Sequence, residues 1–330
     1  MAGMTYRSLS LLAGLLLTLA GCGAPSAPPG QTSYALSTRV GQSSWNTRHG
    51  QGTQLATTHY RIYTTATRSE LLGRLPAFME AAYVNYTELT GLRNANIEKP
   101  LPIYMMQTRK EWAALTQQVV GPQAELYLRI QAGGYCYKGV CVFWDIGSVG
   151  TYSLASHEGL HQFFGSTLKN RLPSWLEEGL CTVAEVCDIR TDEVSFTPLR
   201  NVARFTNLRE AIVNGQWIPA QKLIVMDAGD AVLDQTTGGV GYYGQLWALV
   251  LFLRSEPQYR QGMEKMIADA YAGTFDQALK LTPAQVAQLQ NTGRNYNKAV
   301  SGPLLEHYIS NDLPKFERQY EAFARKLAGL

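Results

Sequence analysis

The stretch SHEGLHQFF places two of the chain's five histidines, His157 and His161, four residues apart, with Glu158 directly after the first. On an α-helix, residues at this spacing lie about 40° apart around the axis and about 6 Å apart along it. The two imidazoles therefore project from one face, where both can reach a single divalent cation. The pattern constrains the fold, because it requires a helix here and a second element packed across it. A surface helix with a fortuitous histidine pair is the alternative.

The continuation, PSWLEEGL, contains a candidate third ligand. Ser174 followed by Glu177 predicts a capping box and the start of a new helix. The Glu177 carboxylate is then engaged in the cap, whereas Glu178 points about 100° away and is free to face the metal. Two histidines, Glu178 and a water would form a zinc site with one open position, and Glu158 could accept a proton from that water. A solvated helix start is the alternative for the two glutamates.

The N-terminus predicts export. Arg7 precedes the apolar run LSLLAGLLLTLAG, whose length suits a signal peptide better than a membrane span. The run ends in LAGC, which resembles a bacterial lipobox and implies that Cys22 is lipidated. We therefore expect a signal peptide over 1–21 and a flexible Pro/Gly/Ser-rich tether, with the lipidated cysteine, over 22–55. The predicted location is the bacterial cell envelope, outside the cytoplasm, with a lipid anchor in the membrane; an ordinary cleaved signal peptide is the alternative.

Four further cysteines, Cys136, Cys141, Cys181 and Cys187, predict two disulfides in an exported protein. Three pairings are possible, and the local pairs Cys136–Cys141 and Cys181–Cys187 are preferred. Metal ligation by these thiols is disfavoured, because neither pair has CxxC spacing and the compartment is oxidising.

The remaining sequence predicts an α+β fold. Strands are expected at 59–66 and at LPIYMMQ, and GGYCYKGVCVFWDIG reads as a hairpin with its turn at Lys138–Gly139. Beyond residue 200 the pattern is mostly helical. We expect an α+β lobe with a small mixed sheet over 56–200 and a helical lobe over 201–330, with the histidine helix at their junction. The formal charge of +3 and the absence of a Lys/Arg run give no indication of nucleic-acid binding.

The segments HEGLH and PSWLEEGL together resemble the gluzincin metallopeptidases, in particular the peptidase-MA-like family of bacterial lipoproteins. The resemblance covers roughly 100–255 and includes PLPIYMMQTRKEW and YYGQLWALVLFL. It implies a zincin-like fold. It also implies that His157, His161 and Glu178 are zinc ligands and that Glu158 is the general base.

Two further residues are candidates near such a centre. Tyr243 matches a tyrosine of the family's later block and is offered as an oxyanion donor, with the adjacent Tyr242 as the alternative. Glu185 lies on nearly the same helical face as Glu178 and could orient a ligating histidine through a hydrogen bond. A surface glutamate is the alternative for Glu185.

The functional prediction is zinc-dependent hydrolysis of peptide bonds in a peptide or protein substrate, at the cell envelope. No acidic motif for gripping a free N-terminus is evident, which favours an endopeptidase. From composition and the family resemblance, the hairpin segment GGYCYKGVCVFW is expected to form an edge strand that pairs with an extended substrate. One rival is a catalytically inactive zinc-site binding or scaffold lipoprotein, although zinc binding alone does not need Glu158. The other is a structural lipoprotein with a coincidental motif.

Overall fold

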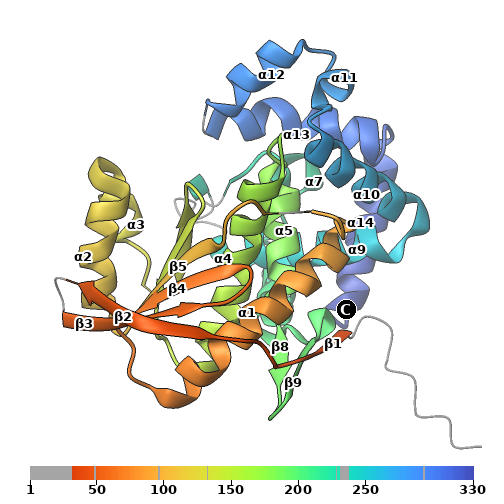
Figure 1. The fold of residues 1–330 in the computed structure, drawn as a ribbon. Helices are drawn as coiled ribbons and strands as arrows, with labels where there is room; N and C mark the ends of the chain where they lie inside the picture. Colours follow the sequence, from red (N-terminus) through yellow and green to blue (C-terminus); the bar gives the residue numbers. More distant parts are fainter. Residues whose placement is uncertain are drawn as a thin grey trace, which may run out of the picture.

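A computed structural model gives the fold of the chain (Figure 1). The residues that it describes are 32–47, 50–95, 97–131, 133–227, 229–230, 238–292 and 294–330. The predicted signal peptide and Cys22 lie outside the described residues.

The central element is a six-stranded mixed sheet. Its strands lie in the order β2 (Gly41–Thr47), β3 (Gly50–Ala56), β4 (Tyr60–Thr64), β5 (Leu101–Met106), β7 (Val140–Trp144) and β6 (Gly134–Tyr137). Strands β4, β5 and β7 are parallel, because helical crossovers connect them, and the other neighbours are antiparallel. A second sheet has the order β1 (Thr32–Ala35), β9 (Glu193–Phe196) and β8 (Cys187–Ile189).

Helices dominate the C-terminal half. The described helices are α1 (Ser69–Thr90), α2 (Arg109–Val120), η1 (Gly121–Gln123), α3 (Ala124–Tyr127), α4 (Ser148–Thr167), α5 (Ser174–Ala184), η2 (Pro198–Arg200), α6 (Val202–Val213), α7 (Ala220–Leu223), α9 (Gly238–Ser255), α10 (Pro257–Ala272), α11 (Phe275–Leu279), α12 (Pro283–Gln290), α13 (Arg294–Tyr308) and α14 (Leu313–Leu327). The α+β class, the mixed sheet and the mostly helical C-terminal half are thus confirmed. Among the residues that the structure describes, no helix combines the length and apolar character needed to cross a bilayer.

The predicted tether over 22–55 is corrected by the structure. Strand β1 pairs with β9, and β2 and β3 form a hairpin that extends the six-stranded sheet. The composition is rich in Gly, Ser, Thr and Gln, but aromatic contacts hold the hairpin in place. The Trp45 ring lies 5.4 Å from that of Tyr63 and 5.6 Å from that of Tyr104. A flexible tether is therefore wrong from Thr32 onward.

The sheet is covered on both faces. Helices α1 and α4 pack on one face, and α2 packs on the other. Successive side chains of a strand point to opposite faces. Accordingly, Met105 and Phe143 belong to the main core, whereas Met106 and Val142 join Trp112 in a smaller cluster under α2. Burial on both faces explains why β5 and β7 read as almost continuous apolar runs.

Helix α9 anchors the C-terminal half. Every residue from Leu246 to Leu253 is buried, because α5, α6, α10 and α14 all pack against this helix. One core cluster includes residues from both predicted lobes. The histidine helix α4 and its partner α5 thus lie between the sheet and α9 (Figure 1).

The approach of α5 to α9 requires a glycine at position 179. A Cβ there would lie 2.5 Å from Val250 Cγ2 and 3.0 Å from the Leu246 carbonyl oxygen. We therefore expect Gly179→Ala to lower the free energy of unfolding by about 1–3 kcal/mol, through overpacking. In the matched control Gly165→Ala, on α4, the new Cβ meets nothing within 4 Å. That change should raise stability by up to about 1 kcal/mol through helix propensity. Chemical denaturation of both variants checks this, and equal effects would contradict it.

Candidate metal centre

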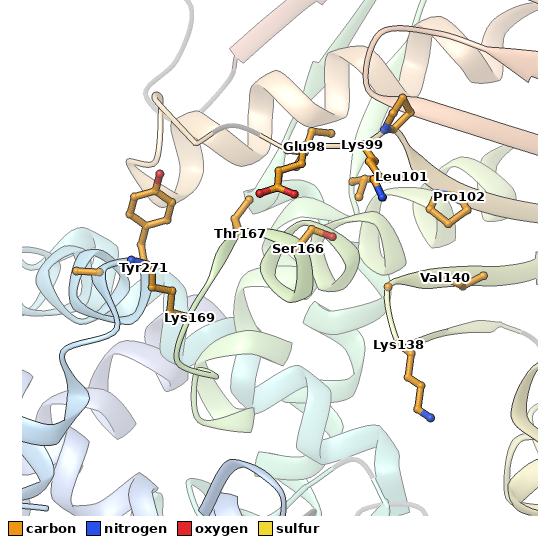
Figure 2. A pocket seen from close by; sticks show the side chains of 14 residues that line it. Glu98, Lys99, Leu101, Pro102, Lys138, Val140, Ser166, Thr167, Lys169 and Tyr271 are labelled. Atoms are coloured by element: carbon orange, nitrogen blue, oxygen red, sulfur yellow. The ribbon is translucent and has the colours of Figure 1, made fainter. Parts of the chain in front are cut away.

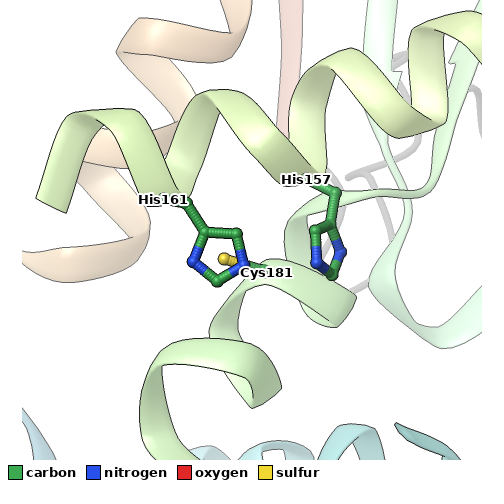
Figure 3. A group of neighbouring side chains, drawn as sticks. All are labelled: His157, His161 and Cys181. Carbon is green, nitrogen blue, oxygen red and sulfur yellow. The ribbon is translucent and has the colours of Figure 1, made fainter. Parts of the chain in front are cut away.

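Helix α4 forms where the sequence predicts it and projects both histidines of the motif from one face. Figure 3 shows the rings of His157 and His161 directed from α4 towards α5. Two buried hydrogen bonds fix this part of α4. Ser156 Oγ donates to the Ala184 carbonyl at 2.8 Å, and Tyr86 Oη donates to the Ser156 carbonyl at 2.7 Å. The rings are therefore held by a helix that is bonded to its neighbours on two sides.

Glu178 completes a three-atom arrangement with the two rings. Its Oε2 lies 3.5 Å from Nε2 of His157 and 3.5 Å from Nε2 of His161. This oxygen is buried and has no hydrogen-bond partner among the described residues. Ligand atoms around a tetrahedral zinc, with bonds of about 2.0–2.2 Å, are separated by about 3.3–3.6 Å. Both distances from the carboxylate oxygen to the imidazole nitrogens fall in the range that two ligands of one small divalent cation have.

The outward nitrogens of both rings are bonded to carboxylates. Nδ1 of His157 lies 3.0 Å from Glu185 Oε2, and Nδ1 of His161 lies 2.8 Å from Glu177 Oε1. A proton on each Nδ1 leaves each Nε2 with its lone pair directed at the centre, which is the tautomer a metal ligand needs. Glu185 is 6% exposed, so the structure excludes a surface role for this side chain.

The role of Glu177 differs from the predicted one. The helix begins at Ser174 itself, with Pro173 as N-cap and no side-chain capping bond. The Ser174 amide instead donates to Asn297 Oδ1 at 2.8 Å. The prediction of a capping box is therefore wrong, and the Glu177 carboxylate is free to form a hydrogen bond with His161. Sequence reasoning missed this contact because it placed the start of the helix one residue too late.

Helix α6 and its N-cap residue, Asn201, supply two residues that sequence reasoning also missed. Arg204 donates to Glu185 from Nε at 2.8 Å and from Nη2 at 3.1 Å, and Asn201 Nδ2 donates to the same carboxylate at 2.7 Å. Burial raises the pKa of Glu185, but the hydrogen bond to His157 and the charge of Arg204 outweigh it and lower the pKa to about 2. Arg204 thus helps to keep this carboxylate ionised, and Arg204 and Asn201 together fix its position against the ring.

Cys181 is the unexpected member of the group. His157, His161 and Cys181 place ligand atoms within 4.8 Å of one another, an arrangement that can hold a metal ion. Figure 3 shows the sulfur beside the His161 ring. The sequence favoured a disulfide between Cys181 and Cys187 among three possible pairings and disfavoured metal ligation, because the cysteines lack CxxC spacing.

Neither predicted disulfide is present in the structure. All four described cysteines are free. Cys136 and Cys141 lie opposite each other in the β6–β7 hairpin, whose turn falls at Lys138–Gly139 as predicted. Cys141 Sγ instead donates a hydrogen bond to the main-chain carbonyl of Glu158 at 3.1 Å.

The Glu158 carboxylate is buried beside the edge strand. The side chain is 8% exposed, and the backbone N–H of Cys136 donates to its carboxylate. In a two-residue hairpin the closing pair is hydrogen bonded inward, so the backbone of Cys136 faces outward from the sheet. Burial is the main reason that the pKa of Glu158 is raised. Strand β6 is the edge of the described sheet, so its outward backbone has no neighbouring strand there. The hydrogen bond from Cys136 places this backbone next to Glu158, the candidate base.

Of the two tyrosines, Tyr243 is the one beside the site's supporting residues. Tyr242 is fully buried and donates to the Met226 carbonyl at 3.4 Å. The ring of Tyr243 lies 5.0 Å from the Arg204 guanidinium. Burial, followed by the charge of Glu178, raises the pKa of Tyr243, so its hydroxyl stays protonated and able to donate. The residue lies within α9.

The centre is a buried cluster of opposite charges. Burial disfavours a charged His157, yet the carboxylates of Glu178 and Glu185 beside the ring raise its pKa to about 9. Burial also disfavours a charged His161, but the neighbouring Cys181, followed by Glu178 and Glu177, outweighs burial and raises the pKa of this ring. The two imidazoles likewise hold the pKa of Glu178 below its usual range despite burial. Without a metal, two protonated imidazole rings thus face one carboxylate. Their combined charge of +2 equals the charge that a divalent cation would bring to the same place.

The link between Glu185 and His157 can be measured directly. In the metal-free protein, Glu185→Gln should lower the pKa of His157 by at least about one unit, because a negative charge that favours the imidazolium is removed. Histidine NMR titration provides the measurement. Glu193→Gln is the control, since that carboxylate lies on β9 and pairs with Arg190 at 3.3 Å. An unchanged His157 pKa in the Glu185 variant would show that Glu185 does not stabilise the protonated ring.

A separate cavity of about 680 Å³ lies near the far end of α4 (Figure 2). Ser166 and Thr167 of α4 line it together with Lys99, Lys138 and Lys169. Neither histidine of the motif lines this cavity. It therefore adjoins the β6–β7 turn but is not the metal centre.

Comparison with known proteins adds no relative: no protein-family model, no curated protein and no solved structure matches the chain.

Proposed function

We propose that this chain is a zinc-dependent peptidase of the cell envelope with a zincin-like fold, anchored by a lipid on Cys22. The observation that carries the proposal is the position of Glu178 Oε2, which is buried, lacks a hydrogen-bond partner among the described residues and lies 3.5 Å from each Nε2. The resemblance of HEGLH and PSWLEEGL to the gluzincins, and specifically the peptidase-MA-like family, is consistent with this centre.

The donor set fits zinc. Two imidazole nitrogens and one carboxylate oxygen are donors that zinc accepts in hydrolytic sites, and both rings carry the outer carboxylates that usually orient such ligands. When bound, zinc would supply Lewis acidity, polarising a substrate carbonyl and lowering the pKa of a water.

Glu158 is the general base of the proposal. It takes a proton from the attacking water and later delivers that proton to the departing amine. A carboxylate in water is a weak base at neutral pH, and burial raises the pKa of Glu158 towards the range that this exchange needs. Glu158 follows His157 on α4 and is turned about 100° from it around the helix axis. It therefore lies near the proposed metal without being one of its ligands.

Two other features accommodate the substrate. The outward backbone of β6, at Gly134 and at the Cys136 carbonyl, can pair with an extended peptide, which would bring a scissile bond near Glu158. The protonated hydroxyl of Tyr243 can donate to the oxyanion that develops on the substrate carbonyl. Pairing along an open edge favours internal cleavage, as in an endopeptidase.

Two variants test the proposal. His157→Ala should abolish stoichiometric zinc binding, because one of three ligands is removed. Glu158→Gln should retain zinc and lose about 10²–10⁴-fold in kcat, because only the proton acceptor is removed. Zinc content by mass spectrometry and peptide release from a mixed peptide library provide the two readouts.

The outcomes separate the rival functions. Wild-type protein that binds no zinc would contradict the proposal and leave a coincidental motif. Zinc bound without cleavage of any library peptide would favour the inactive binding or scaffold lipoprotein. Cleavage that survives Glu158→Gln unchanged would contradict the assigned base.

A further inference from the structure

Cys181 has chemistry that the proposed reaction does not use. It follows Glu178 by three residues on α5, so both side chains lie on the side of the helix that faces α4. The residue is 0% exposed, and its thiol is free. Its sulfur belongs to the group of ligand atoms, with those of His157 and His161, that lie within 4.8 Å of one another.

A second observation indicates that a cation can bind beside the two histidine rings. Glu178 Oε2 is buried and lacks a hydrogen-bond partner among the described residues, although it is aimed at both rings. Leaving such an oxygen unsatisfied is costly unless something binds it. The free thiol and the unpartnered oxygen thus come from one helix and approach the same pair of imidazoles.

Sulfur is a donor that zinc accepts readily. Cysteine thiolates are common zinc ligands, at about 2.3 Å, and soft ligands favour zinc over hard divalent ions. The group within 4.8 Å holds His157, His161 and Cys181, and Glu178 is placed beside it by its 3.5 Å contacts with both rings. Two histidines, a glutamate and a cysteine would together fill the four positions of a tetrahedral site. Cys187, in β8, is in neither the group nor these contacts.

We propose that Cys181 is a fourth protein ligand in the resting protein and occupies the coordination position that a water needs for catalysis. The inference rests on the proposed function, because it requires the metal. On binding, the S–H bond of Cys181 breaks, its electron pair forms the bond to the metal, and the proton leaves to solvent. No oxidant or reductant is involved.

The consequence is a closed, latent centre. With four protein donors in place, Glu158 has no water to deprotonate. Release of the sulfur opens one position and leaves the two imidazoles and Glu178 as ligands. Cys181 would then set the resting activity without taking part in peptide hydrolysis.

Cobalt substitution of the full chain tests this. Co²⁺ replaces zinc and gives a near-ultraviolet charge-transfer band when a thiolate is a ligand. We expect the band in cobalt-loaded wild-type protein and in the matched control Cys187→Ser. We expect Cys181→Ser and Cys181→Ala to lose the band while still binding one equivalent of cobalt. Their metal affinity should fall by at least about 10-fold, since loss of an outer-shell partner alone costs that much.

The outcomes are distinct. Cobalt bound in one equivalent without a thiolate band, or a band that persists in both Cys181 variants, overturns the role of Cys181 and leaves the peptidase proposal intact. Failure of the wild-type protein to bind any cobalt or zinc overturns both proposals. The Cys181 variants should also show higher basal peptide cleavage than wild type, and equal cleavage at equal metal content would contradict latency.

Discussion

The site depends on the approach of one carboxylate oxygen to two imidazole nitrogens. Glu178 Oε2 lies 3.5 Å from Nε2 of both His157 and His161, and between 12% and 17% of each of these three side chains is exposed. Without a cation, the arrangement needs protonated rings to balance the carboxylates. Helices α4 and α5 must therefore hold these three side chains close together in the folded chain.

That support comes from the packing of α5. Helix α5 contacts α4 on one side and α9 on the other, and Gly179 allows the second contact to be close. Arg204, on α6, then holds Glu185 against His157. The C-terminal helices thus act on the centre through a chain of direct contacts, although most of them contribute no candidate ligand.

Much of this arrangement was predictable from local sequence. The four-residue spacing predicted that His157 and His161 share one face of a helix. The turn residues Lys138 and Gly139 between two apolar runs predicted the hairpin. Contacts between distant residues were not predictable in the same way. Arg204 reaches Glu185 from another helix, and the β2–β3 hairpin depends on aromatic contacts of Trp45 with residues of later strands. Cys181 was misassigned because its partner is a histidine on α4 rather than a nearby cysteine.

The most direct measurement is anomalous X-ray diffraction at the zinc edge, from crystals of the zinc-loaded protein. We expect one strong peak within about 2.0–2.3 Å of Nε2 of His157, Nε2 of His161 and a carboxylate oxygen of Glu178. A zinc-loaded crystal with no peak between these three side chains, or with Glu178 turned away from both rings, would contradict it.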